Sequence, residues 1–129
     1  MTTPEDSRYA KTHEYVHLEG DVATIGITDY AQKELGDVVF VELPQPGTQI
    51  EADNEMGSIE SVKAVSELFA PVTGDVIEVN DLLREKPELV NTDPYGDGWM
   101  IKVRIADQTE YDELMDATEY EDYIQTESH

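Results

Sequence analysis

The chain has no cysteine, and it has only 8 basic residues against 30 acidic ones in a length of 129. Without cysteine there is no disulfide, thiolate zinc site or cysteine nucleophile, so sulfur chemistry would have to come from a cofactor. The net charge of −22 excludes nucleic acid and anionic membranes as partners, because both require a basic face. No apolar run approaches the roughly 18 residues that span a bilayer. The polar start, Met1–Ser7, lacks the apolar stretch of a signal peptide, so we expect a cytoplasmic protein.

High net charge is also typical of disorder, but the apolar residues are arranged as in a β-rich fold. Val and Ile total 20 against 8 Leu, and β-branched side chains favour strands. They gather in short runs bounded by turn formers: Val22–Ile27, Val38–Leu43, Val76–Val79 and Met100–Ile105. The length suits one domain with a real core. We therefore predict a mostly β domain with a few short helices.

The ends of the chain differ from this β-rich middle. We expect residues 1–8 to form a flexible tail and residues 9–129 to form a single domain. Residues 108–126 are acidic and have apolar side chains at helical spacing, which predicts short C-terminal helices that cover the core. Thr118 and Glu121 form a capping-box pattern at the start of the second of these helices.

Three further local patterns lead to structural expectations. His13–Leu18 is predicted to be a strand. Thr28 and Gly36 are suited to cap the two ends of a short helix. Val38–Leu43 has almost no polar interruption, which predicts a strand covered on both faces.

A short motif repeats at an offset of 38 residues. Gly36–Val39 reads Gly-Asp-Val-Val, and Gly74–Ile77 reads Gly-Asp-Val-Ile; Val41 likewise recurs as Val79. The repeat suggests a core built from two similar halves. The segment that contains Lys63 lies between the two copies.

The sequence does not predict a metal site. His13 and His17 have the spacing of a helical metal pair, but in a strand four residues span about 13 Å, which is too far for one ion. Paired carboxylates are the background in this composition and single out no site. Lys63 lies among acids that favour its charged form, so it is unsuited to act as a catalytic amine, although an enzyme with an activated acid could acylate it.

Five segments cover most of residues 9–105: HEYV (13–16), VATIGITDYAQKELGDVVFVELP (22–44), ESVKA (60–64), APVTGDVIEVN (70–80) and PELVNTDPYGDGWM (87–100). In their order and spacing these segments together resemble the glycine cleavage system H protein family. The chain departs from the family at Tyr15, where Trp is common, and at Thr12, where Ser is usual. Both replacements keep the chemical character of the side chain, and neither touches the lysine motif.

The resemblance implies a lipoyl/biotinyl-domain-like flattened β-barrel, a barrel-sandwich hybrid, with short helices that include the C-terminus. It implies that Lys63 lies at a hairpin turn and carries one lipoic acid in amide linkage, attached by a lipoyl-attaching enzyme. The chain would then be a carrier subunit without catalytic residues. It would take the aminomethyl group of glycine from a pyridoxal-phosphate-dependent glycine decarboxylase to an aminomethyltransferase, and be reoxidised by dihydrolipoyl dehydrogenase.

The family also holds the loaded arm in a cleft of the carrier, where an acid can pair with the cationic amine of the cargo. Glu14 in the HE motif is the first candidate for this acid, and Glu67 is the second.

Three alternatives stay open at this stage. A lipoyl or biotinyl domain of a 2-oxo acid dehydrogenase or a carboxylase shares the fold, but those domains usually show DKA or MKM around the lysine. A lipoyl donor or relay for other lipoylated enzymes would share the modified lysine. An acidic interaction module would leave Lys63 unmodified.

The acid excess needs an explanation of its own. Self-repulsion among exposed carboxylates destabilises a compact state unless salt screens the charges. We interpret the composition as that of a halophilic protein.

Overall fold

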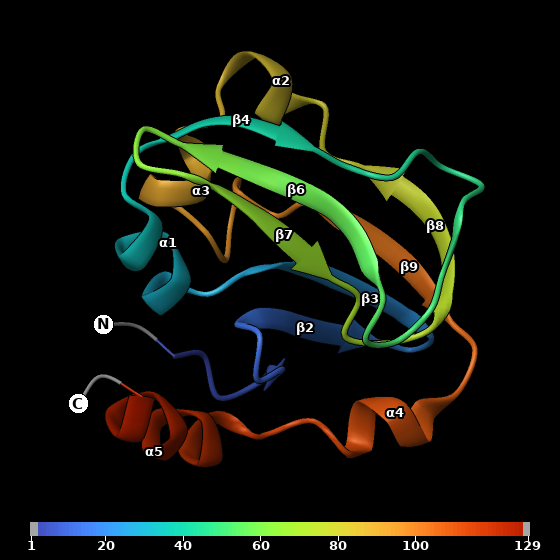
Figure 1. Ribbon diagram of the computed structural model, residues 1–129. Helices are drawn as coiled ribbons and strands as arrows, with labels where there is room; N and C mark the ends of the chain where they lie inside the picture. The colour runs from blue at the N-terminus through green and yellow to red at the C-terminus, as the bar shows by residue number, and fades with distance from the viewer. Residues whose placement is uncertain (1–2, 128–129) are drawn as a thin grey trace.

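Two antiparallel β-sheets and five short helices make up the computed structural model, which describes residues 3–127 (Figure 1). The strands are β1 (Arg8–Tyr9), β2 (Glu14–Glu19), β3 (Val22–Ile27), β4 (Val38–Glu42), β5 (Gln49–Ile50), β6 (Glu55–Ser61), β7 (Val65–Phe69), β8 (Gly74–Val79) and β9 (Ile101–Ile105). The helices are α1 (Asp29–Leu35), α2 (Leu82–Glu85), α3 (Leu89–Thr92), α4 (Gln108–Asp112) and α5 (Ala117–Glu127). The predicted fold class, mostly β with short helices, is confirmed.

The two sheets face each other across one hydrophobic core. The larger has the order β1-β2-β3-β9-β8-β5, and the smaller has the order β4-β6-β7. Both sheets contribute fully or nearly fully buried side chains to this core, among them Ile25, Val76, Val103, Val41, Ile59 and Leu68. None of the helices within residues 3–127 is long and apolar enough to cross a membrane.

The repeated motif has a structural counterpart. Val38, the first residue of β4, corresponds to Val76, the third residue of β8, and both are buried. Each is followed by a break in the register, between Val38 and Phe40 in β4 and between Val76 and Glu78 in β8. The two copies therefore build the same bulged strand, one in each sheet.

The prediction that residues 38–43 form a strand covered on both faces is wrong. Val39 and Phe40 are 47% and 55% exposed. β4 is an edge strand of the smaller sheet and packs on the core with one face only. The bulge adds a second outward-facing residue in succession, so an unbroken apolar run here does not mean full burial.

The N-terminal segment joins the fold before the predicted boundary at residue 8. Ser7 is buried and Arg8 begins β1. The Arg8 guanidinium donates hydrogen bonds to the carbonyls of Asp112 and Leu114, at 3.2 and 3.1 Å, and so connects β1 to the C-terminal region. Residues 1–2 of the expected tail lie outside the described residues.

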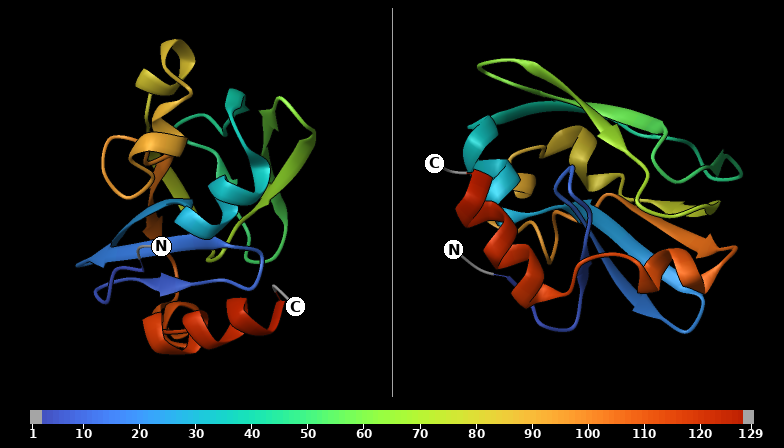
Figure 2. Two further views of the ribbon diagram at one scale, coloured as in Figure 1. Left: turned by 90° about the vertical axis from the view of Figure 1, so that its left-hand side faces the viewer. Right: turned by 60° about the horizontal axis from the view of Figure 1, so that its bottom comes forward.

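The two C-terminal helices are present as expected, and the second has a shifted start. Tyr111 of α4 packs against the main core, whereas Ala117 and Tyr120 of α5 form a second cluster with Tyr9 and Tyr15. α5 begins at Ala117, and the capping box is formed by Asp116 and Glu119, each of which accepts the backbone N–H of the other, at 2.8 and 3.1 Å. The box predicted at residues 118 and 121 is therefore two residues too late. Tyr120 is buried and stacks on Tyr9 with 4.7 Å between ring centroids, which fixes α5 beside β1 (Figure 2).

Candidate carrier lysine and adjoining cleft

Lys63 lies at the exposed turn of the β6–β7 hairpin, where the resemblance places it. The turn is closed by the Ser61 N–H, which donates to the carbonyl of Ala64 at 2.9 Å. The buried Ser61 hydroxyl accepts the backbone N–H groups of Lys63 and Ala64 at 3.2 and 3.3 Å. One side-chain oxygen thus satisfies the backbone of the turn and leaves the Lys63 side chain outside it.

The Lys63 amine rests against the C-terminal end of α1. Its Nζ donates to the carbonyl of Glu34 at 3.2 Å. Such a carbonyl has no partner within its own helix and lies at the negative end of the helix dipole, so an ammonium group is suited to it. Gly36 ends α1 with φ +77°, and a Cβ there would lie 3.4 Å from Lys63 Cε. The lysine stem therefore passes directly over the glycine.

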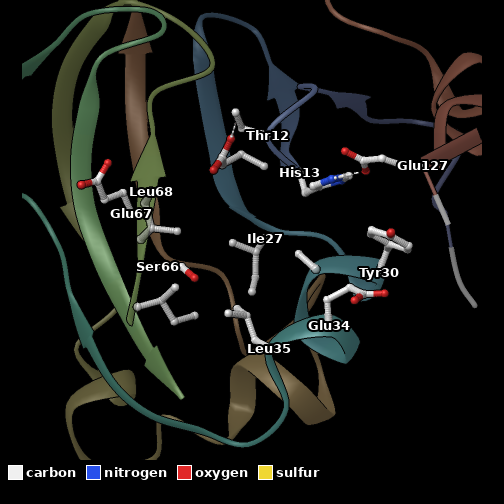
Figure 3. Close-up of a pocket in the computed structure, with 13 residues that line it drawn as sticks. Thr12, His13, Ile27, Tyr30, Glu34, Leu35, Ser66, Glu67, Leu68 and Glu127 are labelled. Carbon is white, nitrogen blue, oxygen red and sulfur yellow. Dashed lines mark hydrogen bonds and ion pairs between the residues drawn. The ribbon is translucent and has the colours of Figure 1, made fainter. Parts of the chain in front are cut away.

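A cleft of about 450 Å³ opens next to this position, between α1, β7 and the segment that precedes β2 (Figure 3). It begins at Glu34, the residue that Lys63 contacts. Its lining is partly apolar, with Ile27, Leu35 and Leu68, and partly acidic or hydroxylic. An extended chain attached to Lys63 could therefore lie in this cleft, where it would meet both apolar walls and polar groups.

Glu14 is the buried acid of the cleft. Glu14 lines the cleft, and only 1% of its surface is exposed to solvent. The carboxylate accepts the Thr12 hydroxyl and the Phe69 N–H, the latter at 3.3 Å. Burial raises the pKa of Glu14 from its usual 4.5 to about 7, and these two hydrogen bonds limit the rise. Near neutral pH Glu14 is therefore poised between its neutral and charged forms.

Glu67 also borders the cleft, but its carboxylate faces the other way. In Figure 3 the Ser66 and Leu68 side chains point into the cleft, whereas the Glu67 carboxylate points to the opposite side of β7. This is the alternation of a β-strand, and Glu67 is exposed accordingly. Of the two acids that the sequence singled out, the structure brings only Glu14 into the interior of the cleft.

The far wall of the cleft contains His13, which the sequence analysis rejected as a metal ligand and placed at the start of a strand that in fact begins at Glu14. His13 has a positive φ of 75°. Its Nε2 lies 2.8 Å from a carboxylate oxygen of Glu127, and its Nδ1 lies 2.8 Å from the hydroxyl of Tyr120. His17 instead contacts Asp6 and Glu19. Within residues 3–127 no group of three or more potential ligands could hold a metal ion. His13 therefore connects the cleft wall to α5.

Several cleft residues escaped the sequence analysis: Tyr30, Glu34, Ser66 and Glu127. Glu127 comes from a C-terminal stretch dense in acids, and nothing in its local pattern distinguishes it. Ser66 had a usable signal, because its alternation with Leu68 puts both side chains on the inner face of a strand.

Comparison with known proteins agrees with this geometry. Residues 7–127 match the family model described as glycine cleavage H-protein. The chain is 56% identical over 124 residues to the glycine cleavage system H protein of Bacillus licheniformis, which covers 96% of this chain and 98% of that one. It is 53% identical over 122 residues to the probable glycine cleavage system H protein of Haloarcula marismortui, with 95% and 96% covered.

A solved structure is also similar along its whole length. The crystal structure of a glycine cleavage system H protein from Mycobacterium marinum superposes with a TM-score of 0.85 at 36% identity, and covers 98% of this chain and 99% of that one. An exposed hairpin lysine, an adjoining cleft and nearly full-length similarity all lead to one conclusion. The chain belongs to the glycine cleavage H-protein family, the lipoyl carriers of the glycine cleavage system, and is a carrier subunit rather than a catalyst.

Proposed function

We propose that this chain carries one lipoic acid in amide linkage on Lys63 and transports the aminomethyl group of glycine between enzymes. It would receive this group at the glycine decarboxylase, deliver it at the aminomethyltransferase and be reoxidised at dihydrolipoyl dehydrogenase, all in the cytoplasm. The observation that carries the proposal is the exposed Lys63 amine beside a cleft of about 450 Å³. A residue that must reach three active sites needs an exposed turn, and a reactive cargo needs shelter between visits.

The residues present fit a lipoyl group. The Lys63 amine is exposed for acylation, and within residues 3–127 its one hydrogen bond is to the backbone carbonyl of Glu34, so loss of the charge leaves no buried partner behind. Ile27, Leu35 and Leu68 offer apolar walls to a hydrocarbon arm. When bound, the group supplies the redox-active sulfur chemistry that a chain without cysteine lacks.

Glu14 would pair with the cationic amine of the cargo. As a buried carboxylate with a pKa near 7, it can accept a positive charge at close range in a poorly solvated site, where such pairing is strong. Thr12 and the Phe69 N–H hold the carboxylate in place. Glu67 is the weaker part of the proposal, because its carboxylate lies on the outer face of β7 and would act at the rim only.

Peptide mass spectrometry across residues 62–68 of the native protein tests the attachment. The expected result is the mass of one lipoyl amide on Lys63. An unmodified Lys63 in protein taken from its own cell would favour the alternative of an acidic interaction module.

Glycine/CO2 exchange tests the transport. The lipoylated chain, combined with the decarboxylase, is expected to support exchange of labelled CO2 into glycine, and the unlipoylated chain is not. A lipoylated chain that fails in exchange but donates its lipoyl group to other apoproteins would show the alternative function, a lipoyl relay.

A further inference from the structure

Four of the six exposed large hydrophobic residues within residues 3–127 gather around Lys63. Val62 and Val65 flank the turn and are both 67% exposed. Val39 and Phe40, at the start of the neighbouring strand β4, are also exposed, and the Val62 N–H donates to the carbonyl of Asp37 just before them. We call Val39, Phe40, Val62 and Val65 the lysine-side patch.

The register of the smaller sheet places one carboxylate, Glu60, within this patch. Phe40 pairs with Glu60, and Glu60 pairs with Val65, so these three side chains form one row on the outer face. The next row along the strands contains Glu42, Ser58 and Glu67. The patch therefore has apolar side chains on both sides of Glu60, and two further carboxylates, Glu42 and Glu67, border it farther from Lys63.

The internal repeat supplies a comparison within the same molecule. Val39 corresponds to Ile77, which is also exposed at a bulge, but Phe40 corresponds to Glu78. Glu78 is paired in register with Lys102, whereas Phe40 is paired with Glu60. In the half without the carrier lysine this position is charged and faces an opposite charge. In the half with Lys63 it is a large ring that no neighbouring strand covers.

We propose that the lysine-side patch is the docking surface of the enzyme that attaches the lipoyl group to Lys63; this inference rests on the proposed function. The attaching enzyme must bring its active site to Nζ itself, so it has to contact the side chains next to the turn. Enzymes that use the finished carrier meet the far end of a long arm and need no such contact. The partner surface that fits has an apolar pocket for Phe40, bordered by basic side chains that face Glu42, Glu60 and Glu67.

A second copy of this chain does not fit the patch. It would bring another 22 net negative charges against the carboxylate border, and like charges oppose association.

The transfer at this surface is a simple acyl substitution. The neutral Lys63 amine attacks the carbonyl carbon of lipoic acid activated as its acyl adenylate. The new N–C amide bond forms, the bond between the carbonyl carbon and the phosphate oxygen breaks, AMP leaves, and the amine proton passes to a base of the partner or to water. Docking places Nζ for this attack and takes no part in the chemistry.

The experiment compares Phe40→Glu with Ile77→Glu as substrates. Unlipoylated protein is incubated with a lipoyl-attaching ligase, lipoic acid and ATP, and initial rates are followed by intact mass. Phe40→Glu is expected to raise the KM for the carrier about tenfold with kcat within about twofold, as for an interface residue that anchors docking. Ile77→Glu adds the same charge at an exposed bulge in the other half, and its KM is expected to stay within about twofold of wild type.

A second patch variant and an exchange assay provide a test of the inference that does not depend on the folding of Phe40→Glu alone. Val65→Ser, a milder change at a well-exposed position, is expected to raise KM severalfold even if Phe40→Glu folds poorly. Phe40→Glu protein that has been fully lipoylated is expected to support glycine/CO2 exchange at the wild-type rate.

A wild-type KM for both patch variants would overturn the inference, as would an equal rise in Ile77→Glu. Loss of exchange in lipoylated Phe40→Glu would assign the patch to the decarboxylase and overturn it too. If wild-type Lys63 is not acylated at all, the proposed function fails instead.

Discussion

The turn with Lys63 and the floor of the cleft with Glu14 are neighbouring regions with opposite physical designs. Lys63 is exposed and its amine rests on a backbone carbonyl, so its position depends on local turn geometry. Glu14 is 1% exposed, and its raised pKa depends on strands and loops far apart in sequence that enclose it. The difference fits the two proposed roles, because attachment of an arm at Lys63 requires an exposed amine, whereas pairing of Glu14 with a cationic cargo is strong only where water is excluded.

The largest expected effect comes from removing the amine at the turn. Lys63→Arg keeps the charge, but guanidinium stays protonated and offers no lone pair for acylation. We expect complete loss of lipoylation by intact mass and complete loss of glycine/CO2 exchange. Lys33→Arg, in the exposed part of α1, is the matched control and should be lipoylated normally. Any lipoyl mass on Lys63→Arg protein would contradict the assignment.

The second largest effect is expected in the pH dependence of stability, which tests whether Glu14 is buried. Because the folded pKa is raised above its usual value, the native state binds the Glu14 proton more tightly than the unfolded chain does. Wild type should therefore lose stability relative to Glu14→Gln as pH rises from about 4.5 to about 7, by about 3 kcal/mol in total, and level off above that. Denaturant unfolding at a series of pH values measures this difference.

Glu67→Gln is the control for that series. It removes the exposed carboxylate on the outer face of β7, and we expect a free energy of unfolding within about 0.5 kcal/mol of wild type. An unchanged difference between wild type and Glu14→Gln from pH 4.5 to pH 7 would show that Glu14 is not enclosed as the structure has it.

A smaller effect concerns how the turn is held. Ser61→Ala leaves the Lys63 and Ala64 N–H groups without their side-chain acceptor, but both residues are exposed at the turn. We expect a loss of about 1 kcal/mol in the free energy of unfolding, and slower lipoylation that Ser61→Thr partly restores. Thr109→Ala, which removes an exposed hydroxyl in α4 and not in the β6–β7 hairpin, should leave the lipoylation rate unchanged. Wild-type lipoylation of Ser61→Ala would mean that the hydroxyl does not position the turn.

Added salt screens exposed charges much more than buried ones. Of the changes considered, it is expected to have the smallest effect on the stability difference between wild type and Glu14→Gln. If the protein is halophilic, as its net charge suggests, its Tm should rise as KCl is raised, because the surface carboxylates repel one another less. The difference in stability between wild type and Glu14→Gln at pH 7 should change by less than about 0.5 kcal/mol, since a buried group is screened little. A flat or falling Tm would remove the halophile interpretation.

Much of the fold could be predicted from local patterns. Val22–Ile27 is a strand with the predicted bounds, and the Thr28 cap and Gly36 end of α1 are present as expected. β6 was not predicted from its pattern, because a register shift between Glu55 and Gly57 breaks the alternation that identifies strands. The exposure of Phe40 was missed for a related reason, since a bulge lets two successive residues face outward.

The sequence by itself determined the family, the candidate for the carrier lysine and the absence of cysteine, because each depends on which residues follow one another along the chain. Only the tertiary structure decided which acid is enclosed, which apolar residues stay exposed and how His13 connects the cleft to α5. The local sequence around Glu14 and Glu67 does not show which of these two glutamates is buried. Their difference arises because burial and side-chain direction are set by which strands pack together, and no local pattern records that.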